Sequence, residues 1–437
     1  MVGGKQMVAS DKVYVSEFVD LIGPKTNMLG PVRDGGVLTT GTEPACYGPM
    51  ITPEIKSGHT ITRPVAVAGA AIGDGLVLKI EKIDITSKAS ASGTETFREG
   101  SYVGDPFVAK KCPGCGMVNP NTRIEGIGKD AIRCAKCGTP VSAFDVTNGY
   151  TMVFDDGRTV GVTVDKTAAE EIARNAKEYA ATPAGFTCHS ILLLALADMQ
   201  AGIISKVRPM LGNFGTLPGV EMPSSHNAGD FGMFLIGAPH DHAITEADLA
   251  LRSDAHMDVD TVGEGTIVIA PVKVDQAGIV VGDVHAMQGD GEISGHTTDV
   301  SAEVTIGVEV IKKLGNDGPL LIPKMEDLPP LARLPSSGEL EIARSVAKKY
   351  GIELQTEVAP IQVVGSGGDL NAATMNGLER MAQLCAMDIN EVKNRVTITG
   401  GIEIGRLPGV VHISTLVPMA RLEQIGIAHL VKEQYGL

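Results

Sequence analysis

Three absences narrow the possible functions of this chain of 437 residues. It lacks a basic excess: the formal net charge is −15 and the isoelectric point about 5.1, whereas nucleic-acid binding calls for a basic surface. It lacks an apolar run long enough to cross a bilayer, since the most apolar segment covers only residues 191–197. Residues 1–10 contain no apolar run of signal-peptide length, so we expect a cytoplasmic protein with no nucleic-acid or membrane partner.

Common nucleotide-binding and hydrolase motifs are absent as well. The sequence contains no Walker loop and no GxSxG nucleophile elbow. Residues 365–368, Gly-Ser-Gly-Gly, follow an expected strand, but Leu370 stands where a dinucleotide-binding fingerprint needs a third glycine or alanine. We therefore expect these residues to form a loop before a helix, with Asp369 near the helix N-terminus.

The seven cysteines do not form the pattern of a disulfide framework. Four of them, Cys112, Cys115, Cys134 and Cys137, form two CxxC pairs, and each pair can fold as a knuckle that points two thiolates at one ion. Four thiolates close a tetrahedral sphere, so we expect a structural Zn²⁺ ribbon with no open position for chemistry. A redox dithiol and a nucleic-acid-binding ribbon are the alternatives. The module is locally basic, which would suit a partner or a subunit contact.

Hydrophobic patterning predicts a β-rich α+β protein. Short valine- and isoleucine-rich runs, interrupted by glycine and proline, predict a β-sandwich or barrel-like core. We expect four parts: an N-terminal β-rich part of the catalytic domain over 1–105, the zinc ribbon as an insertion over 106–143, a β-rich catalytic part over 144–330 and an α+β C-terminal part over 331–437.

Individual elements can be predicted within these parts. A helix is expected from about Lys166 to Ala180, with Asp165 as its cap. The C-terminal part is expected to alternate between helix (338–350), strand (361–364), helix (371–387) and strand (395–399).

One stretch, residues 278–295, sets acids and a histidine among glycines after a valine-rich run. Its Asp290-Gly291 dipeptide favours a two-residue hairpin turn. Given that turn, side-chain alternation puts Val280, Val284 and Ile293 in the core. The same alternation puts five polar side chains on the other face: Asp283, His285, Glu292, Ser294 and His296.

This polar face predicts a functional site. Groups that can bind a metal or move a proton are costly to bury, although an exposed hairpin tip is an alternative interpretation. In a regular ladder Glu292 lies roughly 13 Å from His285, which suits a general base better than a shared metal ligand, unless the glycines bend the turn back. Asp254, His256 and Asp258 form a second candidate cluster, in which two acids flank a histidine.

The same stretch resembles the signature of the acetamidase/formamidase family, hydrolases of short aliphatic amides. Residues 282–292, Gly-Asp-Val-His-Ala-Met-Gln-Gly-Asp-Gly-Glu, carry most of the resemblance. Met257-Asp258 and the apolar residues 267–272 match the preceding family block, and 208–212 and 69–78 are similar to two others. The tail from Asp369 to Pro418 is similar in pattern.

The chain departs from the family pattern in three places. Residues 254–256, Asp-Ala-His, replace the usual Gly-Gly-Asn, and residues 226–252 look like an insertion beside that block. Typical members also lack the ribbon. Because the first two departures touch the presumed pocket, they bear on which amide is the substrate.

The resemblance implies metal-assisted hydrolysis of a small amide to a carboxylate and ammonia. It implies that Asp258 and His285, assisted by Asp283, hold a second divalent metal, expected to be Zn²⁺, and that Glu292 acts as general base and later as acid. The alternatives are hydrolysis of another linear or cyclic C–N bond, and a non-catalytic binding or assembly protein that needs only the ribbon zinc. The apolar surface expected of a β-rich chain also favours a homo-oligomer.

Overall fold

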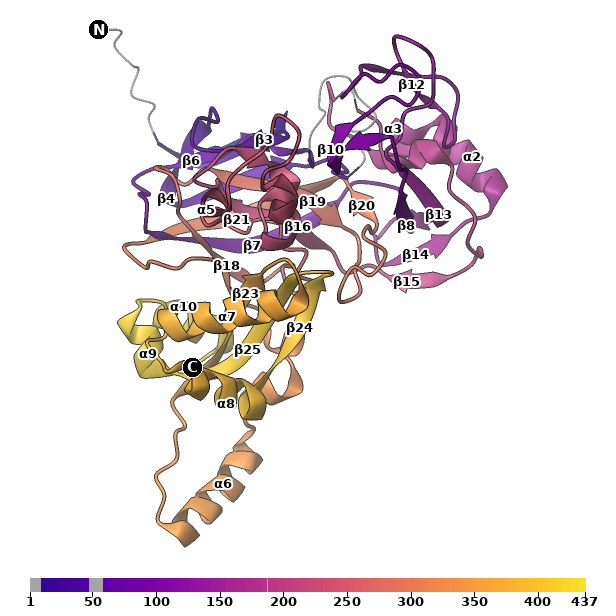
Figure 1. Cartoon of the computed structure of the whole chain (residues 1–437). Helices are drawn as coiled ribbons and strands as arrows, with labels where there is room; N and C mark the ends of the chain where they lie inside the picture. The colour runs from indigo at the N-terminus through magenta and orange to yellow at the C-terminus, as the bar shows by residue number, and fades with distance from the viewer. Residues whose placement is uncertain (1–8, 47–57, 187) are drawn as a thin grey trace, which may run out of the picture.

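The computed structural model describes residues 9–46, 58–186 and 188–437. In these ranges the chain is a β-rich α+β protein, as the sequence predicts. Figure 1 shows a large β-rich body, a smaller β-rich lobe beside it, and a C-terminal α+β region below the body. No helix in the described ranges is long and apolar enough to cross a membrane.

A mixed sheet of fifteen strands runs through the body and into the C-terminal region. Its strands are β1 (Ser10–Val15), β2 (Phe18–Val19), β4 (Leu29–Gly41), β5 (Ile61–Thr62), β6 (Val65–Val67), β7 (Gly75–Ile85), β16 (Met210–Thr216), β18 (Ile267–Pro271), β19 (Ile279–His285), β20 (Asp299–Val300), β21 (Ala302–Ile311), β22 (Leu320–Ile322), β23 (Val358–Ser366), β24 (Gly400–Arg406) and β25 (Val410–Pro418). The main path is β2-β5-β19-β6-β4-β21-β7-β18-β22-β23-β25-β24, and β16 and β20 both pair with β19. Strands far apart in sequence therefore meet at β19.

The smaller lobe holds the cysteine module and a four-stranded antiparallel sheet in the order β15-β14-β13-β8. Its elements are β8 (Ala89–Phe97), β9 (Tyr102–Val103), β10 (Asp105–Lys110), β11 (Thr122–Ile124), β12 (Ile132–Cys134), β13 (Phe144–Phe154), β14 (Val160–Thr163), α2 (Lys166–Arg174), α3 (Ala176–Ala180), η1 (Ile191–Leu194) and β15 (Ile204–Lys206). The expected helix forms and breaks at Asn175, and the Asp165 side chain caps it by accepting a hydrogen bond from the Ala168 N–H.

Short elements connect the longer strands of the body. They are β3 (Leu21–Ile22), β17 (Met222–Pro223), η2 (Ser224–His226), α4 (Gly229–Gly232), η3 (Met233–Leu235) and α5 (Glu246–Leu249). The main core lies between the strands of the body, where buried valines, leucines and isoleucines of β4, β7, β19 and β21 pack together. Burial of this apolar surface is the main force that holds the strands around β19 in place.

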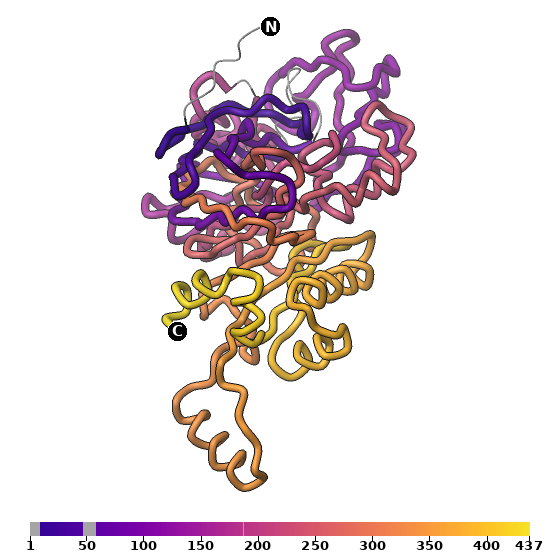
Figure 2. Tube along the Cα trace, turned by 90° about the vertical axis from the view of Figure 1, so that its left-hand side faces the viewer, coloured from indigo at the N-terminus to yellow at the C-terminus, as the bar shows by residue number. Residues whose placement is uncertain are grey.

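The C-terminal region packs helices against the end of the large sheet. Its helical elements are η4 (Met325–Asp327), η5 (Pro330–Ala332), α6 (Ser337–Tyr350), α7 (Leu370–Leu384), α8 (Ile389–Thr399), α9 (Met419–Gln424) and α10 (Ala428–Tyr435). Figure 2 shows that α6 projects away from the rest of the molecule. The predicted helices over 338–350 and 371–387 and the strand over 361–364 are present.

The strand predicted over 395–399 is wrong, because these residues form the last turns of α8. The Asp388 side chain caps that helix by accepting a hydrogen bond from the Asn390 N–H, and the buried Val392 and Val396 stand four residues apart on one face. Packing of this face therefore outweighs the strand preference of the β-branched residues.

The predicted hairpin turn at Asp290-Gly291 is also wrong. β19 ends at His285 and its partner strand begins only at Asp299, so His285 faces Asp299. Gly291 instead bonds to the C-terminal region: its N–H donates to Ile404 O at 2.9 Å, and its carbonyl accepts from the Leu407 N–H at 2.9 Å. Val280 and Val284 are buried as predicted, but Ile293 is 81 % exposed because the loop leaves the sheet.

Candidate active site and metal centres

Asp283 and His285 both project from β19 toward the same cluster of polar side chains. Asp283 adopts a positive φ of 54°, which turns its carboxylate away from a regular ladder. The opposing residue on β16 is Gly212, and a Cβ atom there would collide with Asp258 Oδ1 and Asp283 Oδ2. The backbone of β16 can approach two carboxylates this closely only because Gly212 has no side chain.

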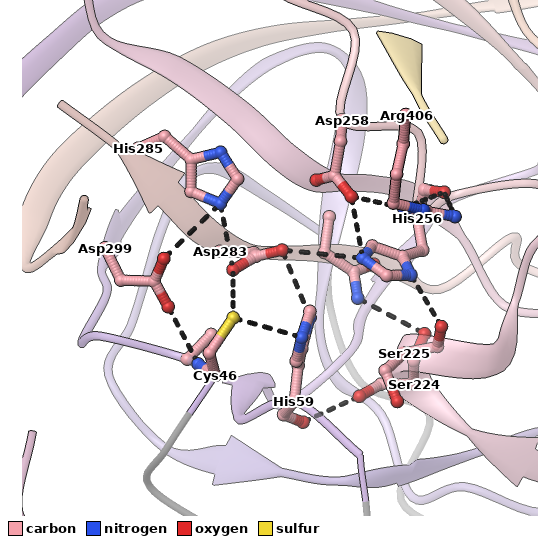
Figure 3. Close-up of polar contacts among 12 residues, drawn as sticks. Cys46, His59, Ser224, Ser225, His256, Asp258, Asp283, His285, Asp299 and Arg406 are labelled. Carbon is pink, nitrogen blue, oxygen red and sulfur yellow. Dashed lines mark hydrogen bonds and ion pairs between the residues drawn. The ribbon is translucent and has the colours of Figure 1, made fainter. Parts of the chain in front are cut away.

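The two carboxylate oxygens of Asp283 face different histidines (Figure 3). Oδ2 lies 3.1 Å from His59 Nδ1 and 3.6 Å from His256 Nε2. Oδ1 lies 3.3 Å from His285 Nε2. Asp283 is thus the residue that joins the two sides of the cluster.

On one side, His256 and Asp258 come from the loop before β18. His256 Nε2 lies 3.0 Å from Asp258 Oδ2, and His256 Nδ1 lies 2.5 Å from the Ser225 carbonyl oxygen. Because a carbonyl can only accept, His256 donates from Nδ1 and presents Nε2 to the carboxylates. Arg406 of β24 forms buried ion pairs with Asp258 and Asp230, so the C-terminal region also helps to hold this side.

On the other side, His285 is oriented by Gln288. The Gln288 amide nitrogen donates to the carbonyls of Asp258 and Gly405 at 2.6 and 3.1 Å, which leaves its oxygen, 2.9 Å from His285 Nδ1, as an acceptor. His285 therefore donates from Nδ1 and presents Nε2 to Asp283 and to Asp299, whose Oδ1 lies 3.5 Å away.

Cys46 lies between the two sides. Its Sγ is 3.4 Å from His59 Nε2 and 3.8 Å from Asp283 Oδ1, and its N–H donates to Asp299 Oδ2 at 2.9 Å (Figure 3). His296 Nε2 lies 3.7 Å from the same Asp299 oxygen. Cys46 therefore places a thiol at the centre of the His and Asp cluster.

The donor set fits metal coordination. Four overlapping groups place three ligand atoms each within 4.8 Å of one another: Cys46–His59–Asp283, His256–Asp258–Asp283, Asp283–His285–Asp299 and Cys46–His296–Asp299. Imidazole nitrogen, carboxylate oxygen and thiolate sulfur are the ligands that zinc uses in proteins. Three buried atoms, Asp258 Oδ1, His285 Nε2 and Asp299 Oδ1, have no hydrogen-bond partner among the described residues, which suits a bound cation.

Burial and proximity shift the pKa values of these groups strongly. Burial opposes ionisation of Asp283, but the charges of His59 and His285 hold the pKa of Asp283 well below its usual range. Burial and the Arg406 charge oppose protonation of His256, but the neighbouring Asp258 and Asp283 raise the pKa of His256 to about 9. The cluster therefore concentrates negative charge that favours a cation.

Glu292 lines the same pocket as Asp258, Asp283, His59 and His256. The pocket contains about 520 Å³ of space between atoms, including its open mouth. Burial, and then the charge of Asp258, raises the pKa of Glu292 to about 8. A carboxyl group with a pKa near neutrality can both accept and return a proton.

The structure brings all four residues that the resemblance implied to one place. Asp258 and His285 stand in two different groups of ligands, which Asp283 joins, and Glu292 reaches the pocket although the predicted hairpin does not form. Sequence reasoning did not single out Cys46, His59 or Asp299. Cys46 and His59 stand in no motif, but the spacing of His296 and Asp299, three residues apart, was a readable signal.

The four predicted ribbon cysteines cluster in the smaller lobe, away from Asp283. Their sulfurs lie within 4.8 Å of one another, with Cys112 Sγ 3.5 Å from Cys137 Sγ and Cys115 Sγ 3.9 Å from Cys134 Sγ. Hydrogen bonds from the Thr139 hydroxyl and N–H lower the pKa of the Cys137 thiol to about 6, which favours the thiolate form that binds a metal. Four cysteines in this arrangement fit a closed zinc site.

Comparison with known families identifies the scaffold. The model of the Acetamidase/Formamidase family matches residues 45–423. The chain belongs to the acetamidase/formamidase family. This match covers β5, β19, β20 and every residue of the Asp283 cluster. Members of this family are amidases that act on carbon–nitrogen bonds. A search of curated proteins gives no match.

Solved structures of acetamidase/formamidase proteins share the fold. The predicted acetamidase/formamidase of Thermoanaerobacter tengcongensis is 18% identical with a TM-score of 0.53, over 95% of this chain and 98% of that one. The acetamidase of Bacillus halodurans is 17% identical with a TM-score of 0.51, over 95% and 99%. The acetamidase of Yersinia enterocolitica is 14% identical with a TM-score of 0.51, over 97% and 94%.

Proposed function

We propose that this family member hydrolyses a small primary amide to a carboxylate and ammonia, with a divalent cation, Zn²⁺, held at the Asp283 cluster. One observation supports this most directly: Asp283 joins buried groups of metal-ligand atoms in a pocket that Glu292 also lines. A cation bound there would polarise the amide carbonyl and acidify a water molecule.

The residues around the cation would have three roles: to bind it, to orient the ligands and to balance their charge. Asp283 would hold it, together with His256 and Asp258 on one side or with His285 and Asp299 on the other, and Cys46 and His59 form a further group with Asp283. Gln288 and the Ser225 carbonyl fix the two histidines so that Nε2 faces the centre, which limits reorganisation when the cation binds. Arg406 balances the charge of Asp258.

Glu292 moves the proton. Amide hydrolysis requires that water lose a proton as its oxygen bonds to the carbonyl carbon, and that the leaving nitrogen gain one as the C–N bond breaks. A single carboxylate can do both in sequence, so no proton is gained or lost overall. Glu292 lines the pocket without belonging to any of the ligand groups, and its pKa of about 8 suits the transfer of a proton.

Ammonia release from a panel of primary amides, measured on zinc-loaded protein with and without a chelator, tests the proposal. We expect release that the chelator abolishes and added zinc restores. Release that is unchanged after the Asp283 cluster has been emptied would contradict the metal role. No release from any amide by protein that carries about two zinc ions per chain would contradict the reaction.

A further inference from the structure

One wall of the pocket is aromatic. Phe107 of β10, Phe144 of β13 and Phe231 of α4 all line it. Their rings pack on one another, with centroids 5.3 Å apart for Phe107 and Phe144 and 4.8 Å apart for Phe107 and Phe231. His59, Asp258 and Glu292 line the same pocket, and the Phe231 ring also packs against Arg406 and His256, so the aromatic side chains border the reactive groups directly.

The aromatic wall is built by the segments in which this chain departs from the family pattern. Phe107 and Phe144 lie at the two ends of the cysteine module, and Phe231 lies in the 226–252 segment. β10 continues from Phe107 to Lys110, two residues before Cys112, so the strand that leads into the ribbon also lines the pocket. The ribbon is therefore placed to hold the wall of this pocket.

We propose that this wall binds the acyl group of the substrate, which is a primary amide carrying an aromatic ring or a branched aliphatic chain. This rests on the amide hydrolysis proposed above. Phe144 is already buried, but the methyl group of acetamide is too small to cover Phe107 and Phe231, which are only partly buried and would remain in contact with water. A phenyl or branched group would exclude that water and stack on Phe107 and Phe231.

Charge in the pocket further limits the acyl group. Carboxyl groups of Glu95, Asp258, Asp283 and Glu292 line it, and its two cationic side chains are already paired with acids: Arg406 with Asp230 and Asp258, and His256 with Asp258. An acyl group with its own carboxylate would meet repulsion from these acids. The substrate is therefore neutral at its apolar end.

The test compares kcat/KM for phenylacetamide, benzamide and isovaleramide with that for acetamide and formamide. We expect the larger amides to be favoured by on the order of 100-fold. Phe107→Ala and Phe231→Ala should each lower that ratio about tenfold, mainly through a higher KM for the larger amides. Phenylacetate should inhibit more tightly than acetate in the wild type and lose this advantage in both variants.

Phe234→Ala is the matched control. Phe234 belongs to the same aromatic cluster, 6.1 Å from Phe231 by ring centroids, but it does not line the pocket, so its removal should leave the ratio unchanged. Preference for acetamide over the larger amides, with no effect of Phe231→Ala, would overturn this substrate class and leave amide hydrolysis intact. Failure to hydrolyse any amide would overturn both.

A second observation concerns helix α6, which projects from the C-terminal region (Figures 1 and 2). Ile342, Val346 and Tyr350, spaced four residues apart, are 68 %, 52 % and 65 % exposed. They form an apolar stripe on the outer face of the helix. A helix of 14 residues that packs on little else is marginally stable in water, so this stripe calls for a partner.

The residues of this apolar stripe and two charged residues beside it are spaced symmetrically before and after Arg344, so two copies of the helix can pair with each other. Ile342 and Val346 stand two residues on either side of Arg344, and Glu339 and Lys349 stand five residues on either side. At 3.6 residues per turn, Glu339 and Lys349 fall on the same face as Ile342 and Val346. In an antiparallel pair of two such helices, Ile342 meets Val346 of the second copy. Lys349 of the second copy lies near Glu339, whose carboxylate also caps its own helix by accepting from the Ser336 N–H and hydroxyl.

We infer that α6 is a dimerisation arm that pairs with α6 of a second copy of this chain around a two-fold axis. The antiparallel arrangement also aligns the helix dipoles favourably, and Gly338 leaves room opposite Tyr350 of the other copy.

Light scattering during size-exclusion chromatography tests whether α6 holds two copies of the chain together. We expect a dimer for the wild-type protein and a monomer for Ile342→Glu and for Lys349→Glu, each with unchanged amide turnover. Lys348→Glu makes the same charge change away from the stripe and should remain dimeric. A wild-type monomer, or a dimer that survives Ile342→Glu, would overturn the inference.

Discussion

Asp283 Oδ2 lies 3.1 Å from His59 Nδ1, although one residue lies on β19 and the other precedes β5. The pairing of Gly282 with Ile61 brings them together, and a side chain at Gly282 would collide with Ile61. Because the other oxygen of Asp283 faces His285, this one carboxylate links both sides of the candidate metal centre.

Asp283→Asn should remove the cation of this centre and keep the ribbon zinc. An amide offers one neutral oxygen where the carboxylate offered two charged ones, so amide turnover should fall on the order of 100-fold or more. Metal per chain after dialysis and ammonia release are the measurements. Asp275→Asn, on the exposed turn before β19, is the control. An Asp283→Asn protein with wild-type metal content would remove Asp283 from the ligand set.

Glu292→Gln should retain metal and fold but lose most turnover, by about 100-fold or more, because glutamine cannot take up a proton. Asp290→Asn, on the same loop but outside the pocket lining, should remain active. Metal analysis and steady-state kinetics on both variants separate the two effects. Near-normal turnover of Glu292→Gln would mean that another group carries the proton.

Cys134→Ser should release one zinc ion per chain and leave the metal of the Asp283 centre in place. The four cysteine sulfurs form a closed site, so loss of one ligand weakens the whole of it. Cys385→Ala removes a buried cysteine of the C-terminal core and should not change metal content. A wild-type zinc content in Cys134→Ser would show that the ribbon holds no metal through this residue.

The lowered pKa of Asp254 makes the free energy of unfolding depend on pH. Burial opposes its ionisation, but Arg252 and Arg380, at 2.7 and 2.6 Å, lower the pKa of Asp254 to about 2. Because the pKa is lower in the folded than in the unfolded protein, the stabilisation is complete above about pH 4 and is lost as the pH falls toward 2. It corresponds to about 2 kcal/mol.

The Asp254→Asn variant should therefore be less stable than the wild type at pH 7, and the difference should shrink between pH 4 and pH 2. Urea unfolding at several pH values measures it. Asp275→Asn, an exposed acid, should show no such trend. A difference in unfolding free energy that stays constant from pH 7 to pH 2 would mean that the ion pairs with Arg252 and Arg380 are not its source.

Part of this site could be predicted from the local sequence. The CxxC pairs carry their ligands three residues apart, and Asp283 and His285 share a strand, so spacing alone predicted that the members of each pair lie together. The β-rich α+β class followed from short apolar runs between glycines and prolines. The hairpin prediction failed for a long-range reason: Gly291 hydrogen-bonds to the backbone of residues 404 and 407, and no pattern around residue 290 encodes that partner.

The rest depended on tertiary structure. His59, Cys46 and Asp299 become ligand candidates only because β5 and β20 pair with β19, and strand pairing between distant segments is decided by core packing rather than by local preference. The same holds for the aromatic wall of the pocket. By itself the sequence determined which residues can bind a metal or move a proton; burial of the sheet decided which of them stand within reach of Asp283, because only packing brings segments hundreds of residues apart to a few ångströms.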